Sequence, residues 1–438
     1  MRRHERVLGL DISSDFIKVV ELEGISGAVR LNAFNAAKMP EGGMRDGVIA
    51  DPAGTGRIVS GLLSENNISA KNAVASIRSP YALLRLSRLP FMTREQAEIA
   101  LKKEIGQYTA FKGRETVSDL HVIEEISEAG ARKMNVLFVV AAKELCNSYL
   151  ETAKAAGLNL VAIDASPVAT LRCVSHTSLK LSGIETTMLM CVGQESIDMC
   201  ILKGGSMRLC HTIKVEKDQS GQTIDNFVER VAAAFKLVVN FYSAQTTGGE
   251  QITRAVLAFE SHKASLISDR LKTRLAEVSI DAGDPVGDIV LNEDRISSES
   301  VKELAYFTSA IGSALQARDA DYYPIRFNLI PKEKAKKAEL IKVMRFLNAV
   351  LGAVFFGFLV CAGAIFAGNK VLQMQDEALK RELHTSDPLL NKVDYIFKER
   401  DRIQARIQDK VTLLTGIFSS TTAWDMVFAN AMARMPER

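Results

Sequence analysis

The chain has few of the residues that build metal sites. Six cysteines and six histidines occur among 438 residues, and no two cysteines form a C-x-x-C pair. The histidines are scattered, so no zinc motif is present and no metal ligands are predicted. Five of the cysteines precede the apolar segment described below. We expect these five to be small buried side chains in a reducing compartment.

A strong charge imbalance is also missing. The net charge is +3, and no basic run interleaved with aromatic residues occurs in the first three quarters of the chain. This composition argues against nucleic acid as a partner. The N-terminus is basic, but Asp11 interrupts its apolar run, so no signal peptide is predicted. We therefore expect the segment before the apolar run to stay in the cytoplasm.

The chain does have one long apolar run. Residues 346–367 read FLNAVLGAVFFGFLVCAGAIFA and carry no charge over about 22 residues. A helix of this length crosses a hydrocarbon core of about 30 Å. Basic residues precede the run and mixed charges follow it, which places its N-terminal side in the cytoplasm. The sequence predicts a single-pass protein of the bacterial inner membrane with a periplasmic C-terminus.

The segment after the apolar run has the periodicity of helices. Pro388, in HTSDP, divides it into two amphipathic stretches, with Phe397 and Ile407 on the apolar side of the second. Both faces around this apolar side carry charges of both signs, as in a short coiled coil with a partner helix. A solvated stalk without a partner is the alternative.

A strand–turn–strand pattern occurs twice in the cytoplasmic part. Residues 7–24 read VLGLDISSDFIKVVELEG, and residues 187–204 read TMLMCVGQESIDMCILKG. Aligned without a gap, Asp11 meets Cys191. The alternation of strands and helices indicates an α/β protein, and the repeat predicts two related lobes. Two lobes whose turns face one cleft are the plan of the two-lobed actin-like ATPase fold.

Local signals between the repeats mark an insertion in the first lobe. Thr93 is the predicted N-cap of a helix, and Gly157 is a predicted stop for the helix that begins near residue 143. Together with the intervening strands, these helices predict an inserted subdomain over about 93–164.

Several segments of the cytoplasmic part resemble the PilM family of type IV pilus assembly, which is actin-like and related in fold to FtsA. They are LGLDISSDFIKVVEL, GVIADP, SRLPFMTREQAEIALKKEIGQYTAF, KELCNSYLETAKAAGLNLVAIDASPVATLR and AIGSALQARDA. The resemblance covers about residues 7–320. It implies one PilM-like cytoplasmic domain over 1–320.

A second resemblance begins at IRFNLIPKEK, which is similar to the N-terminus of the PilN family. An Asn-Leu-Leu-Pro-like peptide of that family docks on PilM, so the resemblance implies a PilM–PilN fusion. Its docking residues would be Phe327, Asn328, Leu329, Ile330 and Pro331. The alternative is the last turn of a linker before the membrane.

The expected groove lies between the first subdomain and its insertion, in the same chain or a neighbouring copy. Leu329 and Ile330 would be apolar anchors, and Asn328 would satisfy backbone groups as a strand-like segment docks. The domain boundaries that follow are 321–345 for the docking peptide and basic linker, 346–367 for the span, 368–415 for the coiled coil and 416–438 for the start of a PilN-like periplasmic domain.

The three loops of an actin-like nucleotide site are present only in part. The residues that match or flank the phosphate turns are Asp11, Ser13, Ser14, Lys18 and Gly193. Ser13 stands where the family has glycine, and Cys191 replaces an acid although cysteine is a poor magnesium ligand. Ala258, Phe259 and Glu260 occupy the glycine positions of the adenosine loop, where close approach of a purine needs a bare backbone.

These departures predict a vestigial site without catalytic residues and without ATP hydrolysis. Asp15 and Glu195 add negative charge beside the two turns, although a magnesium ion would reverse that repulsion. ATP with magnesium is the cofactor that the fold would accept, but none is expected to be bound. Asp11 is interpreted as a hydrogen-bonded turn residue retained for the fold.

The resulting hypothesis is a non-catalytic inner-membrane scaffold of a type IV pilus-like machine. Its partners would be a PilO-like protein through the coiled coil, pilus motor or platform proteins on the cytoplasmic side, and further copies in an oligomer. One alternative is an ATP-binding regulatory protein of the same machine. Another is the analogous inner-membrane component of a type II secretion system.

Overall fold

The computed structural model divides into two compact units, Met1–Ala338 and Glu339–Arg438, and each is described by itself. The structure describes residues 5–25, 28–78, 81–128, 130–175, 177–179, 185–193, 196–214, 224–245, 251–259, 264–317, 323–383 and 390–419.

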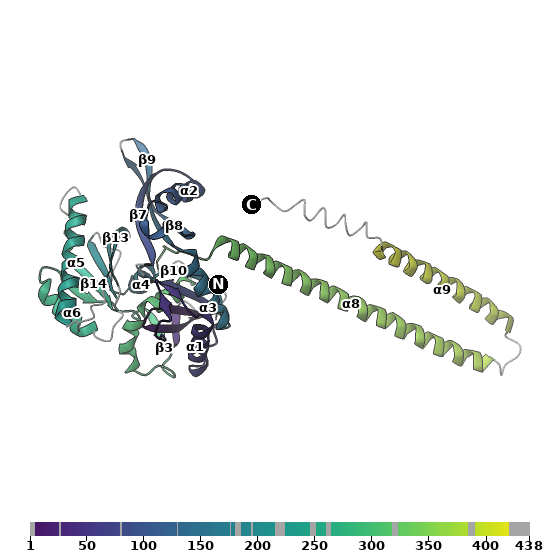
Figure 1. The fold of residues 1–438 in the computed structure, drawn as a ribbon. Helices are drawn as coiled ribbons and strands as arrows, with labels where there is room; N and C mark the ends of the chain where they lie inside the picture. Colours follow the sequence, from purple (N-terminus) through teal and green to yellow (C-terminus); the bar gives the residue numbers. More distant parts are fainter. Residues whose placement is uncertain are drawn as a thin grey trace. The chain divides into compact units, whose positions relative to one another are not determined.

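The first lobe is built on a six-stranded sheet with the order β10-β6-β1-β2-β3-β16 (Figure 1). Its strands are β1 Arg6–Ile12, β2 Phe16–Ile25, β3 Ala28–Lys38, β6 Asn72–Ile77, β10 Asn159–Ala165 and β16 Ile289–Leu291. β1, β2 and β3 form an antiparallel meander, and β6 and β10 add to β1 in parallel. Residues buried on both faces of this sheet form the larger core.

The second lobe repeats this arrangement with a five-stranded sheet of order β13-β12-β11-β14-β15. Its strands are β11 Thr186–Val192, β12 Ser196–Lys203, β13 Ser206–Lys214, β14 Arg254–Phe259 and β15 Ser279–Ala282. Again three strands form an antiparallel meander, and two more add to the first strand in parallel. Helices α5 Ile224–Gln245 and α6 Ala264–Arg274 supply the other side of its core. The predicted α/β fold with two related lobes is confirmed.

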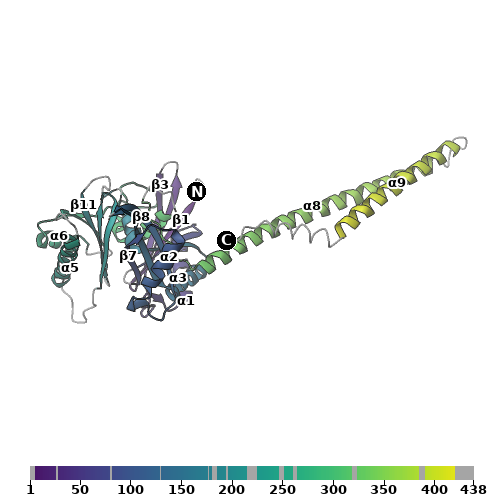
Figure 2. The same ribbon diagram turned by 90° about the horizontal axis from the view of Figure 1, so that it is seen from above.

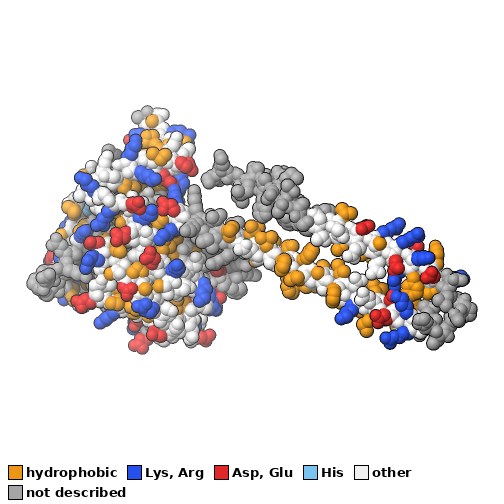
Figure 3. Space-filling view, turned by 45° about the vertical axis from the view of Figure 1, so that its right-hand side comes forward, with side chains coloured by type: hydrophobic (Ala, Val, Ile, Leu, Met, Phe, Trp, Pro, Cys, Tyr) orange, Lys and Arg blue, Asp and Glu red, His pale blue; other side chains and the backbone are white. Residues whose placement is uncertain are grey.

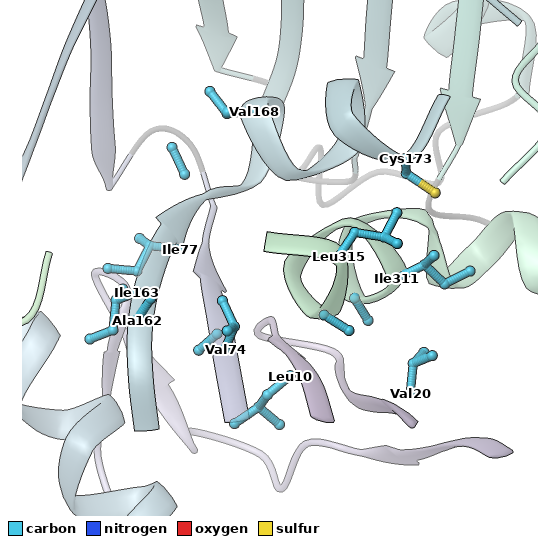
Figure 4. Packing of buried hydrophobic residues seen from close by; sticks show 14 of the residues in the cluster. Leu10, Val20, Val74, Ile77, Ala162, Ile163, Val168, Cys173, Ile311 and Leu315 are labelled. Carbon is cyan, nitrogen blue, oxygen red and sulfur yellow. The ribbon is translucent and has the colours of Figure 1, made fainter. Parts of the chain in front are cut away.

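Two helices cross where the lobes meet: α4 Ser166–Val174 links β10 to β11, and α7 Thr308–Gln316 lies on β1. Figure 4 shows Ile311 and Leu315 of α7 beside Cys173 of α4. A Cβ on Gly312 would lie 1.8 Å from the carbonyl oxygen of Ala169 in α4. The close crossing of α4 and α7 therefore requires glycine at position 312, because any Cβ there would overlap the backbone of α4.

Helices α1 Pro52–Glu65 and α3 Lys143–Ala155 pack against each other in the first lobe. Gly157 has φ +73° just after α3, so the predicted glycine stop is confirmed. The remaining short elements are β4 Met44–Arg45, β5 Val48–Ile49 and the 3-10 helices η1 Thr109–Phe111 and η2 Ser300–Phe307. The five cysteines expected to be buried are buried, whereas Cys361 is exposed.

The inserted subdomain is a three-stranded sheet of order β7-β9-β8 covered by a helix. Its elements are β7 Ala82–Pro90, α2 Arg94–Ile105, β8 Thr116–Glu128 and β9 Ala131–Ala142. Thr93 caps α2 in a capping box with Gln96, as predicted. The bounds differ from 93–164, because β7 pairs along β9 and belongs to the insertion, whereas α3 and β10 belong to the first lobe.

The second unit is helical (Figure 2). Helix α8 runs over Lys332–Leu383, and its stretch Leu347–Arg381 is long and apolar enough to cross a membrane. Apolar side chains gather on the surface of this helix in the space-filling view (Figure 3). Helix α9 Leu390–Ser419 follows, and Arg400 of α9 forms an ion pair with Asp376 of α8. The break at 384–388 and most of the segment 416–438 lie outside the described residues.

Candidate functional site

The two hairpins that would clasp a nucleotide have the same register. The pairs Arg6↔Glu23 to Ile12↔Ile17 of β1–β2 recur as Thr186↔Lys203 to Val192↔Ile197 of β11–β12, at a constant offset of 180 residues. The turns repeat as well. The N–H of Ser13 donates to the carbonyl of Phe16 at 2.9 Å, and that of Gly193 to the carbonyl of Ser196 at 3.0 Å. The internal duplication is therefore complete at the level of the backbone.

In the first hairpin, two cations surround the Asp11 carboxylate. Arg78, just after β6, donates from Nε to Oδ1 at 3.1 Å and from Nη2 to Oδ2. The Lys18 ammonium lies 3.6 Å from the same Oδ2. Asp11 is only 1% exposed, so a bidentate and a second ion pair neutralise it inside the protein. The carboxylate thus has the role of a structural ion-pair centre.

Lys18 points away from the turn and into the lobe. Its Nζ donates to the carbonyl oxygen of Tyr306 at 2.8 Å and lies 3.5 Å from the centroid of the Tyr306 ring. Burial lowers the pKa of Lys18 to about 7, with Arg78 adding to that effect and Asp11 opposing it. A lysine held in this way is directed at protein groups instead of the space where phosphates would lie.

The hydroxyl of Ser13 completes its own turn. It donates to the carbonyl of Phe16 and accepts from the N–H of Phe16, both at 3.0 Å. The N–H of Asp15 lies within 3.4 Å of the same oxygen. Ser14 is half-buried in this turn. The Ser13 donors that would face a phosphate are therefore used inside the turn.

The second hairpin holds an acid on the opposite strand. Cys191, at the position of Asp11, is buried, and burial raises the pKa of its thiol far above the ordinary range. Opposite it in the ladder lies Asp198, which accepts from the Thr212 hydroxyl at 2.6 Å. Asp198 occupies the position of Lys18, so the charge on that strand is reversed. Gly193 keeps the turn hydrogen bond, whereas Glu195 lies outside the described residues.

The strand that would lead to the adenosine loop continues through the positions where glycines are needed. Ala258 pairs with Cys191 and Phe259 with Val192, so both belong to β14. Glu260 lies outside the described residues. A strand backbone at this point cannot take the looped path of a glycine-rich base-binding segment.

The fold family implies magnesium and ATP, and these residues do not fit that pair. The acid of the first turn is neutralised by a guanidinium and an ammonium, and a thiol stands in place of the second acid. Magnesium prefers hard oxygen ligands with uncompensated charge.

The docking segment, residues 325–331, lies against the free edge of β10 in its own chain. Ile325, Phe327 and Leu329 are buried in the core of the first lobe, and Asn328 between them is exposed. This alternation is that of a strand. The N–H of Leu329 donates to the carbonyl of Ile163 at 2.9 Å, so one backbone hydrogen bond joins the segment to the edge of β10.

Asn328 makes polar contacts with β10 and with β8. Its side-chain oxygen accepts from the N–H of Ile163 at 3.4 Å, and its amide nitrogen donates to the carbonyl of Val161 at 3.3 Å. Its own N–H donates to the Asp119 carboxylate of β8 at 2.8 Å. The segment is therefore bound by both the first lobe and the insertion. Pro331 is buried and Ile330 half-buried, so Phe327 is the apolar anchor alongside Leu329.

Two charged partners at these sites were missed from the sequence. Arg78 follows β6, and the parallel pairing of β6 with β1 brings it to Asp11. A basic residue just after a strand was the available signal, but its partner strand was unknown. Asp119 lies on β8, more than 200 residues before Asn328, and the sequence held no signal for their contact.

Comparisons with known proteins agree with this fold. Residues 9–224 match the family model for the type IV pilus assembly protein PilM. A solved structure of a PilM–PilN type IV pilus biogenesis complex is similar with a TM-score of 0.62 at 20% identity, covering 72% of this chain and 98% of that one. The ethanolamine utilization protein EutJ of Carboxydothermus hydrogenoformans has a TM-score of 0.38 at 12% identity, covering 71% of this chain and 89% of that one. The cytoplasmic domain of EpsL, of the Vibrio cholerae type II secretion system, has a TM-score of 0.37 at 12% identity, with 75% and 98% covered.

Proposed function

From the PilM-like, actin-like domain that this chain carries, we propose that the protein is a non-catalytic inner-membrane scaffold of a type IV pilus-like machine. The observation that carries the proposal is the docking segment. It contacts β10 of the first lobe and Asp119 of the insertion, and helix α8 begins at Lys332, directly after it. The scaffold would transmit position and force between a cytoplasmic domain and the membrane through these few residues.

The orientation of the chain across the inner membrane would follow from the charges that flank the apolar stretch of α8. The stretch Leu347–Arg381 of α8 would cross the inner membrane with the basic side, before residue 346, in the cytoplasm. Cysteine-accessibility labelling of single engineered sites on each side of the span tests this topology. Labelling of a site at residue 400 from the cytoplasmic side would contradict it.

The extracytoplasmic helix offers a face for a PilO-like partner. Ile403, Ile407, Val411 and Leu414 of α9 are all exposed and recur at helical spacing. Such a stripe supports pairing with a second helix from another protein or another copy. Site-specific crosslinking at Ile407, with the exposed Asp409 on the opposite face as the control position, distinguishes a partnered stripe from a solvated stalk.

Loss of nucleotide use is part of the proposal. The neutralised Asp11 and the buried Cys191 support it, as does the strand at Ala258 and Phe259. Isothermal titration of the full chain with magnesium and ATP should give no binding in the micromolar range. A micromolar affinity that is lost in Asp11→Asn, with the fold intact by circular dichroism, favours the ATP-binding regulatory protein instead.

The docking itself is tested by deleting residues 327–331 from the full chain. Hydrogen exchange should accelerate in β10, whose edge the segment covers, while the core strand β1 stays protected. Unchanged exchange in β10 contradicts docking. The alternative is that the protein belongs to a type II secretion system. Copurification with the full chain distinguishes the two, because pilus proteins would be recovered in one case and secretion proteins in the other.

A further inference from the structure

The segment that precedes the membrane helix is longer than the docking peptide, and it contacts the second lobe. We define residues 323–332 as the tether segment. Tyr323, at its start, is buried, and its hydroxyl donates to the carbonyl oxygen of Gly205 at 3.2 Å. Gly205 lies in the β12–β13 turn, where it and Gly204 both have positive φ. The tether segment is therefore held by the second lobe as well as the first.

The tether segment is also bound by the two crossing helices. Arg172 of α4, 1% exposed, donates from Nη2 to the carbonyl of Ile325 at 2.8 Å. From Nη1 it donates to the carbonyl of Gly312 in α7 at 2.8 Å and pairs with Asp164 of β10 at 2.9 Å. One buried guanidinium thus joins α4, α7, β10 and the tether.

The tether segment also contacts α7 and α2. Gln316, the last residue of α7, donates from Nε2 to the carbonyl of Phe327 at 2.6 Å. At the other end of the segment, Lys332 forms an ion pair with Glu98 of α2 at 2.5 Å. Ten residues of chain therefore contact both lobes, both crossing helices and the insertion.

We propose that the tether segment is an interlobe clamp, so that its docking and the mutual position of the two lobes are coupled. This inference rests on the docking described under the proposed function. When the segment is seated, Tyr323 and Arg172 hold the β12–β13 hairpin and the crossing helices in one arrangement. When it leaves, those contacts are lost together and the lobes gain freedom. Coupling is reciprocal, so a partner that shifts the lobes also changes how firmly the membrane helix is held.

The test is hydrogen exchange on the full chain in lipid nanodiscs. Tyr323→Phe removes one hydroxyl and keeps the ring. Exchange in the β12–β13 hairpin should accelerate about two- to tenfold, the effect of one lost hydrogen bond, while β10 stays protected. Gln316→Met should act in the same way on α7. Val290→Ala, a truncation of an exposed side chain on β16, is the control and should change neither.

Leu329→Ala tests whether docking and clamping are linked. It should accelerate exchange in β10 by about tenfold or more, because a buried leucine is lost, and the β12–β13 hairpin and α4 should follow. If β10 responds but the hairpin and α4 do not, the clamp is wrong and docking stands. If β10 does not respond, docking itself fails. An unchanged hairpin in Tyr323→Phe also overturns the clamp.

Discussion

The hairpins β1–β2 and β11–β12 share their register and turn hydrogen bonds, but different side chains face each other across the two ladders. In the first, an acid on the leading strand faces a lysine on the return strand. In the second, a thiol faces an acid. Ladder hydrogen bonds belong to the backbone and survive such exchanges, whereas a magnesium site depends on two specific side chains. The comparison teaches that the two hairpins keep one backbone frame while the side chains that face each other in it differ.

Replacing the equivalent residue of each leading strand, Asp11 in β1 and Cys191 in β11, should separate the two hairpins most clearly. Asp11→Asn leaves the Lys18 and Arg78 charges without their partner and should lower the free energy of unfolding by about 3–5 kcal/mol. Cys191→Ala removes one buried sulfur and should cost about 1 kcal/mol. Urea denaturation of the full chain in detergent, followed by circular dichroism, measures both. Equal losses in the free energy of unfolding would contradict the prediction that Asp11 is the centre of an ion-pair network and Cys191 only a packed side chain.

Crowding around the leading strands gives the next contrast. A Cβ on Gly9 of β1 would lie 1.8 Å from the carbonyl oxygen of Ala310, whereas the equivalent position in β11 is Leu189. Gly9→Ala should therefore cost about 1–3 kcal/mol, because α7 must move. Gly61→Ala in α1 meets nothing within 4 Å and should stabilise the helix by about 0.5–1 kcal/mol. Opposite signs are expected in thermal melts, and a destabilised Gly61→Ala would invalidate the control.

The lysine of the first pair predicts a pH dependence of stability opposite in sign to that of the buried Cys191 thiol, whose pKa burial raises. The folded pKa of Lys18 is about 7, below the ordinary lysine value of 10.5, because the amine is buried. Between these values the unfolded chain binds a proton that the folded chain does not, so stability from this group rises with pH across the window and is flat below it. The slope is at most about 1.4 kcal/mol per pH unit. Lys18→Met should flatten the stability profile between pH 7 and 10, and an unchanged slope would contradict burial of the amine.

The smallest effect concerns the turns. Ser13→Ala loses the two hydrogen bonds of the hydroxyl with Phe16 and should cost about 0.5–1.5 kcal/mol. Gly193, at the equivalent position, has no side chain, and its N–H donates to the carbonyl of Ser196. Ser13→Gly should therefore cost little more than Ser13→Ala in the same melts. A much larger loss would show that the two turns differ in backbone as well.

Local patterns predicted the parts of the fold that short segments encode. The repeat at constant offset identified both hairpins, and Thr93 and Gly157 marked helix ends through capping and positive φ. In the docking segment the sequence indicated Leu329 and Ile330 as the apolar anchors, whereas the fully buried side chains are those of Phe327 and Leu329.

The sequence patterns did not predict which strands, far apart in the chain, pair with each other. β7 joins β9 across about 50 residues of chain, which moved the start of the insertion from 93 to the beginning of β7. The sequence left the direction of Lys18 open because alternation alone does not say which face is the interior. Arg78 and Arg172 became part of the sites only through packing of elements far apart in sequence.

Because the docking segment contacts its own chain, its binding does not depend on the concentration of a second protein. A groove that takes its peptide from solution fills according to the concentrations of two proteins and empties when one is scarce. Here the peptide and the surface that it contacts belong to one chain, so the ratio of α8 helices to actin-like domains is one to one at any expression level. Dilution cannot separate them, and overproduction of a competing peptide faces a local concentration of roughly millimolar order.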